Sequence, residues 1–259
     1  MNLKIFQVDA FTSRLFKGNP AAVVPLEEWL DDKTMQNIAL ENNLSETAFI
    51  VKEEDYYKIR WMTPTLEVPL CGHATLASAF VIFNYFDKEQ REIVFDSKSG
   101  RLIVTKEDDL LSLNFPANKP EKVEIPDDIV KVVSVAPNEV LFNKSYLAIF
   151  DSEEQIRDMK PDIRTLKNIH ADGLIISARG NSVDFVSRFF VPSAGIDEDP
   201  VTGYAHTILT PYWSEKLGKK KMSVLQVSAR GGELQVEDLG GRVKISGKAV
   251  LYMMGEIKL

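Results

Sequence analysis

The spacing of hydrophobic residues changes along the chain between a period of two and a helical period, which predicts a mixture of strands and helices. In the first half, the strand pattern occurs at residues 3–8, 21–24, 47–52, 56–61, 92–96, 101–106 and 110–115. Helical spacing occurs at 32–42 and 72–86, and a proline-marked loop at 62–70 precedes the second of these helices.

The second half of the chain repeats this order. It contains a helix at about 153–168, strands at 173–177 and 183–190, a loop at 191–202, a helix at 203–217, and strands at 223–228, 233–237, 242–246 and 249–254. Three short sequences recur in the same order, at 60–64 and 188–192, 72–74 and 203–205, and 100–102 and 232–234. Ordered recurrence predicts a structural duplication. We therefore expect two similar domains, 1–117 and 118–259, joined within 116–128.

Helix 72–86 carries apolar residues on every side, from Leu76 to Phe86. A helix without a polar face must be enclosed. Strands surround it in the sequence, so each domain is expected to be a curled, barrel-like β-sheet around a central helix, an α+β fold. The second central helix, 203–217, is less uniformly apolar.

Composition narrows the class of protein. The chain has 44% hydrophobic and 27% charged residues, as soluble globular proteins do. Its net charge of −7 disfavours nucleic acid and anionic membranes as partners. A single cysteine permits no internal disulfide, and the N-terminus lacks the apolar core of a signal peptide. A cytoplasmic location is expected.

The two central helices begin with glycine, at Gly72 and Gly203. The first turn of a helix has unpaired N–H groups and a partial positive charge, and glycine lets an anion approach them closely. If the two domains bring these helix starts together, they would form a cleft suited to a carboxylate. Alternatively, each glycine only allows tight packing of loop and helix.

Several side chains near these helix starts are candidates for chemistry. His73 is suited to acid–base work or to substrate hydrogen bonding, and Cys71 is either a reactive thiol or a small buried residue. Glu46 lies at the entry to a strand. Asp199 is either a functional carboxylate or an N-cap, with Pro200 as the first helical residue. Histidine spacing disfavours a metal site, and no nucleotide-binding motif is present.

Five ordered segments resemble the PhzF-like family of phenazine-biosynthesis isomerases and their homologues. They are FQVDAFTSRLFKGNPAAVV, NLSETAF, RWMTPTLEVPLCGHATLASA, RFFVPSAGIDEDPVTGYAHTIL with PYWSEKLG, and ARGGEL. The resemblance runs from residue 5 to 234. It implies a fold similar to that of diaminopimelate epimerase, with two domains, and it implies a homodimer.

The resemblance also implies the roles of individual residues. Glu46, His73 and Asp199 correspond to the family's catalytic residues. Asn19, Gly72, Gly203 and Tyr204 are then expected to bind substrate, and Tyr204 replaces the serine usual after the TG of EDPVTG. The epimerase uses two cysteines, whereas this chain has Cys71 at the first position and Thr202 at the second, which excludes a two-thiol mechanism.

These observations predict a cofactor-independent isomerase that moves a proton between carbon positions of a small carboxylate-bearing metabolite, with Glu46 as acid and base. A carboxylate becomes a stronger base when it is removed from water. Two alternatives stay open. One is a racemase or epimerase of an amino-acid derivative, and the other is a catalytically idle small-molecule-binding protein with the same fold.

Overall fold

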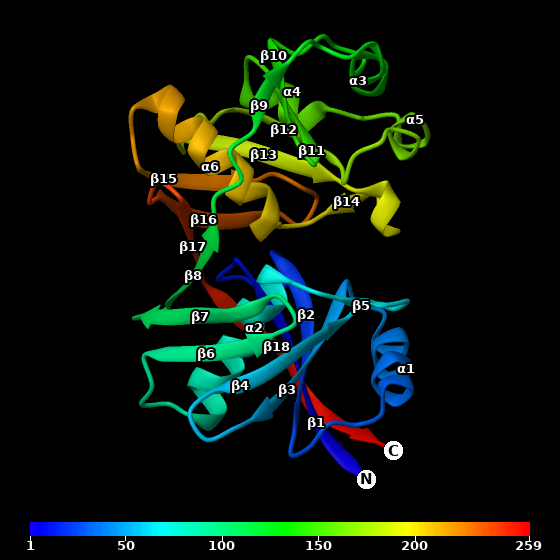
Figure 1. Cartoon of the computed structure of the whole chain (residues 1–259), viewed down its shortest axis with the longest axis vertical. Helices are drawn as coiled ribbons and strands as arrows, with labels where there is room; N and C mark the ends of the chain where they lie inside the picture. The colour runs from blue at the N-terminus through cyan, green and yellow to red at the C-terminus, as the bar shows by residue number, and fades with distance from the viewer. The chain divides into compact units, whose positions relative to one another are not determined.

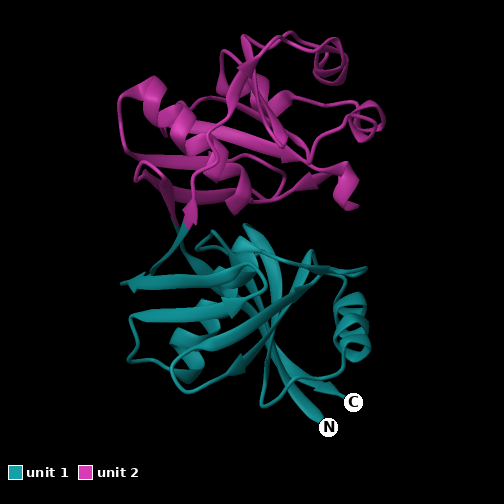
Figure 2. Cartoon of the chain, in the orientation of Figure 1, with its two compact units in different colours: residues 1–114, 246–259 teal, residues 115–245 magenta.

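The strands and helices gather into two compact units, coloured separately in Figure 2. The structure, a computed structural model, describes residues 1–259. Unit 1 comprises Met1–Asn114 with Ser246–Leu259, and unit 2 comprises Phe115–Ile245. The sequence-based division assigned all of 118–259 to the second domain. The structure instead includes the C-terminal segment in unit 1, because its strand pairs with the first strand of the chain.

Unit 1 contains a curled sheet with one helix on each face (Figure 1). Its elements are β1 (Asn2–Ala10), β2 (Asn19–Leu26), α1 (Asp32–Asn42), β3 (Glu46–Lys52), β4 (Tyr57–Met62), β5 (Glu67–Val68), α2 (Gly72–Val81), η1 (Ile82–Phe86), β6 (Glu92–Ser97), β7 (Gly100–Glu107), β8 (Leu110–Pro116) and β18 (Ala249–Lys258). Strands β2 and β3 are parallel, as are β4 and β6, and β1 pairs antiparallel with both β2 and β18.

Helix α2 is the central helix that its sequence predicts. It packs against β1, β2 and β3, and all but two of its ten residues are buried. Helix α1 covers the other face of the same strands, where Met35 and Ile38 meet Val24 and Phe49. Because β2 and β3 are covered on both faces, their sequences read as continuous apolar runs rather than as alternating ones.

The central helix does not continue as an α-helix to residue 86. After Val81 it widens into the π-helical turn η1, in which the N–H of Asp87 donates to the carbonyl of Ile82. The rings of Tyr85 and Phe86 then both contact Phe6, with ring centroids 5.1 and 6.1 Å apart.

Unit 2 repeats the architecture with its own elements. They are β9 (Glu121–Val123), α3 (Asp127–Val133), β10 (Glu139–Asn143), β11 (Ser145–Ile149), α4 (Glu153–Asp158), α5 (Ile163–Lys167), β12 (Leu174–Arg179), β13 (Phe185–Phe190), the 3-10 turn η2 (Pro192–Ala194), β14 (Glu198–Asp199), α6 (Gly203–Leu217), β15 (Lys221–Gln226), β16 (Gly232–Asp238) and β17 (Arg242–Gly247). The pairings match those of unit 1: β11 and β12 are parallel, as are β13 and β15. The predicted α+β fold, a curled sheet around a central helix in each unit, is confirmed.

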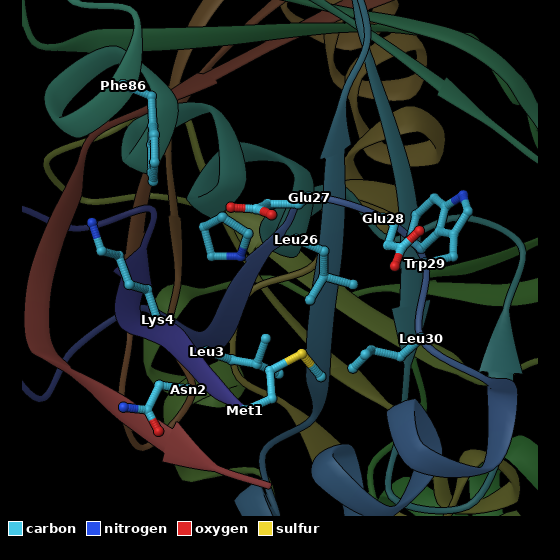
Figure 3. A pocket seen from close by; sticks show the side chains of 11 residues that line it. Met1, Asn2, Leu3, Lys4, Leu26, Glu27, Glu28, Trp29, Leu30 and Phe86 are labelled. Atoms are coloured by element: carbon cyan, nitrogen blue, oxygen red, sulfur yellow. The ribbon is translucent and has the colours of Figure 1, made fainter.

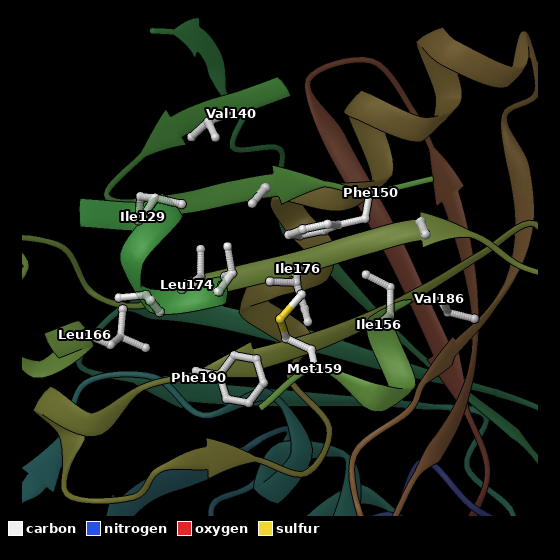
Figure 4. Packing of buried hydrophobic residues seen from close by; sticks show 14 residues of the cluster. Ile129, Val140, Phe150, Ile156, Met159, Leu166, Leu174, Ile176, Val186 and Phe190 are labelled. Atoms are coloured by element: carbon white, nitrogen blue, oxygen red, sulfur yellow. The ribbon is translucent and has the colours of Figure 1, made fainter. Parts of the chain in front are cut away.

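One face of the unit 2 sheet is covered by the short helices α3, α4 and α5 (Figure 4). Ile129, Ile156 and Leu166 from these helices pack against Leu174 and Ile176 of β12. No structure was predicted for 121–123, 127–133, 139–143 or 145–149, where helix α3 of this layer and three strands of the sheet lie.

Helix α6 begins and ends where the sequence predicts, although Pro211 lies inside it. A proline lacks the N–H that would bond to the carbonyl four residues earlier. That carbonyl, of Thr207, instead accepts from the backbone N–H of Asn118, and the Asn118 amide donates to the Thr207 hydroxyl. The more polar helix is therefore as enclosed as α2, with Ala205 to Trp213 all buried.

The same arginine–glutamate pair occurs before both central helices. Arg60 of β4 makes a two-pronged ion pair with Glu67 of β5, and Arg188 of β13 makes one with Glu198 of β14. Each pair ties the short strand that leads into a helix to the preceding long strand, so the duplication extends to side-chain contacts. Every helix of the structure is too short or too polar to cross a lipid bilayer.

Candidate active site

Glu46 and His73 meet within unit 1, where β3 begins and α2 begins. Glu46 is the first residue of β3, and His73 is the second residue of α2. The Nε2 atom of His73 lies 3.2 Å from Oε2 of Glu46, and only 7% and 18% of the two side chains are exposed. Packing of α2 against β3 therefore brings together two residues that the sequence analysis selected from separate motifs.

Asn19 and Cys71 contact the other nitrogen of the imidazole. Asn19 Nδ2 lies 3.2 Å from His73 Nδ1, and Cys71 Sγ lies 3.6 Å from it. An amide nitrogen is a donor, so Nδ1 accepts and the proton of the neutral ring sits on Nε2, which faces Glu46. Asn19, predicted to bind substrate, thus lies beside His73 and orients it.

The facing atoms of the Glu46–His73 pair are close but not aligned. His73 Nε2 and Glu46 Oε2 are both buried, and neither makes a hydrogen bond of good geometry. Buried polar atoms are normally hydrogen-bonded, and leaving them unsatisfied is costly. Such a donor and acceptor, side by side, are suited to a polar ligand that can bond to both.

The buried charges of this cluster influence one another. Burial, and then the Glu46 carboxylate, raise the pKa of the Cys71 thiol, so that Cys71 is not a thiolate at neutral pH. Burial lowers the pKa of His73, and the Glu46 carboxylate beside the ring opposes burial and raises that pKa. Because Cys71 stays protonated, the Glu46 carboxylate is the charge that stabilises an imidazolium at His73.

Glu46, Cys71 and His73 have ligating atoms that all lie within 4.8 Å of one another, a spacing that raises the question of a metal. Their arrangement does not fit one. The imidazole turns Nδ1 to the sulfur and Nε2 to the carboxylate, and a single ion binds only one of these nitrogens. The geometry matches an acid–base cluster better.

Neither central helix has a side chain capping its first turn. Cys71 precedes Gly72 in α2, and Thr202 precedes Gly203 in α6, but neither makes a capping hydrogen bond. The first N–H groups of both helices are therefore left without side-chain partners, as an anion site requires.

Asp199, Gly203 and Tyr204 belong to unit 2. Asp199 ends β14, and its Oδ2 accepts a hydrogen bond of 2.6 Å from the Thr202 hydroxyl. The alternative in which Asp199 is the N-cap and Pro200 the first helical residue is wrong, because the helix begins at Gly203 after Thr202. The Thr202 hydroxyl binds the Asp199 carboxylate instead of capping the helix.

Tyr204 is held by its own unit. Its hydroxyl lies 3.3 Å from Ser145 Oγ and 3.5 Å from the carbonyl oxygen of Asn143, at the turn between β10 and β11. Its ring contacts Phe189, with centroids 6.0 Å apart, and burial raises the pKa of the phenol. The larger side chain at this position is thus fixed by existing contacts.

The structure brings Glu46, His73 and Asn19 into one cluster, with Gly72 next to His73. Gln226 was not among the predicted site residues, although it hydrogen-bonds to both Asp199 and Thr202. No signal in the sequence marked Gln226; the structure shows that it ends its strand where Ser97 ends the corresponding strand of unit 1.

A separate pocket of about 480 Å³ opens on unit 1 (Figure 3). Its walls come from the start of β1, the end of β2, the segment before α1, and Phe86. None of the predicted site residues lines it. Most of its polar side chains, including Lys4, Glu27 and Glu28, are exposed, so it lacks the buried polar groups of the Glu46–His73 cluster.

Other solved structures share this fold. A hydroxyproline epimerase from Agrobacterium vitis has a TM-score of 0.61 at 10% identity, covering 100% of this chain and 93% of that one, a likeness of fold alone. The crystal structure of a PhzF family phenazine biosynthesis protein from Enterococcus faecalis is far more similar, with a TM-score of 0.98, 46% identity and complete coverage of both chains.

The profile of the family described as phenazine biosynthesis-like protein matches residues 8–255, and the chain belongs to this family. A relative from Pseudomonas aeruginosa, named as an uncharacterized isomerase, is 49% identical over the full length of both chains. The resemblance inferred from the five sequence motifs is confirmed.

Proposed function

We propose that this protein is an isomerase that moves a proton between carbon positions of a small carboxylate-bearing metabolite, using Glu46 as acid and base. The observation that carries the proposal is the buried contact between Glu46 Oε2 and His73 Nε2, two atoms without aligned hydrogen bonds. Family membership and the isomerase names of relatives support the general class of reaction.

In this scheme the Glu46 carboxylate removes a proton from a substrate carbon next to an unsaturated group. The electron pair of the broken C–H bond enters that unsaturated system, and Glu46 becomes a carboxylic acid. The Glu46 carboxylic acid exchanges its proton with solvent and then donates a proton to another carbon, which restores its carboxylate. The proton count is unchanged, and the step needs no cofactor.

His73 would donate from Nε2 to an oxygen of the substrate beside the reacting carbon. The Nε2 proton is present in both the neutral ring and the imidazolium, because Asn19 faces Nδ1. A donor at this place stabilises the negative charge that develops when the proton leaves carbon. The first-turn N–H groups at Gly72 and Gly203 would bind carboxylate, and Tyr204 would shape the recognised substrate.

Asp199 is proposed as a second catalytic carboxylate, on the basis of its family motif and its short hydrogen bond with Thr202. Racemisation by two thiols is disfavoured because position 202 is threonine and the Cys71 thiol is held protonated by burial. Homodimerisation and a cytoplasmic location stay predictions from the resemblance and from the composition.

The test is a metabolite screen by mass spectrometry in ²H₂O with purified protein. Wild-type protein is expected to incorporate one deuterium into a small carboxylate, with a change of double-bond position. Glu46→Gln should abolish labelling, whereas Glu41→Gln, at an exposed position of α1, should not affect it.

Each other outcome of the screen contradicts the proposal in a specific way. Labelling with inversion at one stereocentre would identify an epimerase. Labelling that survives Glu46→Gln would remove Glu46 as the base. Binding of small carboxylates without any labelling would indicate the catalytically idle alternative.

A further inference from the structure

Gln226 is almost completely buried, with 1% of its surface exposed, and all of its amide groups bond to one loop. Its Nε2 donates to the carbonyl oxygen of Asp199 at 2.7 Å and to the Thr202 hydroxyl at 3.2 Å. Its Oε1 accepts from the backbone N–H of Thr202 at 2.9 Å. Both amide protons and the oxygen are therefore used between Asp199 and Thr202, and a reversed amide would place its oxygen against the Asp199 carbonyl and its NH2 group against the Thr202 N–H.

Strand register explains how Gln226 reaches this loop. The strands β14 and β15 both pair with β13, through Phe189 and Phe190 for β14 and through residues 185–187 for β15. Gln226 is the last residue of β15 and is paired with Ser187. The end of β15 thus lies beside β14 and the residues that follow it.

The corresponding residue of unit 1, Ser97, makes no hydrogen bond to the loop before its central helix. Ser97 ends β6 as Gln226 ends β15, since Ser97 pairs with Gly100 and Gln226 with Gly232 in the following hairpins. The Ser97 hydroxyl bonds to the carbonyl of Gly100 in its own turn. A glutamine that reaches the loop before the central helix is therefore specific to the unit that carries Asp199.

The hydrogen bonds have a fixed direction. Because Thr202 Oγ1 accepts from Gln226, its single proton is available for Asp199 Oδ2, at 2.6 Å. The Thr202 carbonyl, on the other side, accepts from Nδ1 of His206 at 2.7 Å. Gln226 thus sets the donor that holds the Asp199 carboxylate, while also holding the Asp199 backbone.

We propose that Gln226 is a positioning residue for the Asp199 carboxylate in the isomerisation, acting through the Thr202 hydroxyl and the Asp199 carbonyl. This inference rests on the proposed function, in which Asp199 takes part in proton transfer. Gln226 does not touch the reacting atoms. It sets the orientation of the group that does.

Two variants separate the contributions of the amide. Gln226→Ala removes all three hydrogen bonds, whereas Gln226→Glu keeps an acceptor for the Thr202 N–H and loses the two donors. Gln36→Ala is the matched control, because Gln36 also donates 2.7 Å to a loop carbonyl, that of Thr63. Circular dichroism establishes that each variant is folded. Hydrogen exchange at the Thr202 amide, which donates to Gln226 Oε1, reports on this contact without any substrate.

Exchange at the Thr202 amide is expected to accelerate at least about 10-fold in Gln226→Ala and to stay slow in Gln226→Glu and Gln36→Ala. Misplacement of a catalytic group by about 1 Å costs up to about 100-fold in rate. Deuterium incorporation into the compound that wild type labels should therefore fall about 10- to 100-fold in both Gln226 variants, mainly in kcat. It should be unchanged in Gln36→Ala.

A double variant shows whether Gln226 acts through Asp199. If it does, Gln226→Ala adds no further loss when Asp199→Asn is already present. Two results would overturn the inference and leave the proposed function standing. In one, the double variant loses as much kcat as the product of the two single losses. In the other, Gln226→Ala keeps the wild-type kcat while Asp199→Asn is slow. Wild-type kcat in Asp199→Asn would overturn the inference together with the proposed role of Asp199, whereas the Glu46 test is independent of both.

Discussion

Thr75 and His206 occupy the same position in the two central helices, and each donates a hydrogen bond to the carbonyl of the residue that precedes its helix. Thr75 Oγ1 bonds to the carbonyl of Cys71, and His206 Nδ1 bonds to that of Thr202. In both units, the carbonyl of the residue before the central helix therefore accepts a side-chain hydrogen bond, but from two different residue types. The two side chains differ in that only His206 titrates.

The stability of the protein should depend on pH through His206. Burial lowers the pKa of His206 from its usual 6.5 to about 4, so the unfolded chain binds a proton in this range that the folded chain does not. The contribution to stability is present above pH 6.5 and is lost as the pH falls to about 4, up to about 3 kcal/mol. Urea unfolding at several pH values measures how the free energy of unfolding falls from pH 6.5 to 4. This fall should be smaller in His206→Thr than in wild type, and it should be unchanged in His170→Thr, at an exposed residue. An unchanged fall in His206→Thr would contradict the assignment.

Replacing Asn19 by aspartate should raise the pKa of His73 further. The new carboxylate would face Nδ1, now 3.2 Å from the amide nitrogen, and would favour the imidazolium. Titration of ¹⁵N-labelled histidine by NMR measures the effect directly, with Asn37→Asp on the exposed side of α1 as the control. In wild type, the neutral form of His73 should carry its proton on Nε2. A neutral ring protonated on Nδ1 would disprove the orientation attributed to Asn19.

The Cys71 thiol should react slowly with alkylating reagents in the folded protein. Only the thiolate reacts readily with alkylating reagents, and burial raises the pKa of this thiol. Iodoacetamide at neutral pH is expected to label it slowly until urea unfolds the chain. Cys71→Ala should retain deuterium incorporation within a few-fold of wild type. Rapid labelling of the native protein, coupled to loss of activity, would instead favour a thiol mechanism.

Breaking the arginine–glutamate pair of unit 2 should be costly. Arg188 is 13% exposed, and besides Glu198 it donates to the carbonyls of Ile156 and Met159, so Arg188→Met leaves several acceptors unpaired. We expect a loss of about 2–4 kcal/mol in the free energy of unfolding, measured with urea. The control is Lys221→Met, whose partner Glu237 lies 3.7 Å away and whose side chain is 79% exposed, for which less than about 1 kcal/mol is expected. Equal losses would mean that the pair has no special role.

The central helices and most strands could be predicted because burial on every side leaves a direct trace in the sequence. Apolar residues around α2 and continuous apolar runs in β2 and β3 are of this kind. The short elements β9 and α3 could not be predicted, because three and seven residues are too few to show a period. Their structure depends on packing, as the buried Ile129 and Val132 of α3 show.

The candidate site divides in the same way. Glu46 and His73 were selected because they lie in short motifs that resemble those of the family, and their contact follows from the packing of α2 on β3. Gln226 contacts residues 24 and 27 positions earlier in the chain, through the register of two strands on a third. No local pattern encodes that register, so these contacts of Gln226 could not be predicted from the sequence. The widened turn at η1 was equally hidden, because an apolar run is compatible with either helix type.

The pairing of β18 with β1 has a consequence for biosynthesis. Every residue of β1 pairs with the strand that leaves the ribosome after all other elements of the chain. Unit 2 has its complete set of strands before then, so the unit that is translated first is the last to close. Until that moment the edge of β1 carries unpaired backbone groups, which form a template for pairing with another polypeptide.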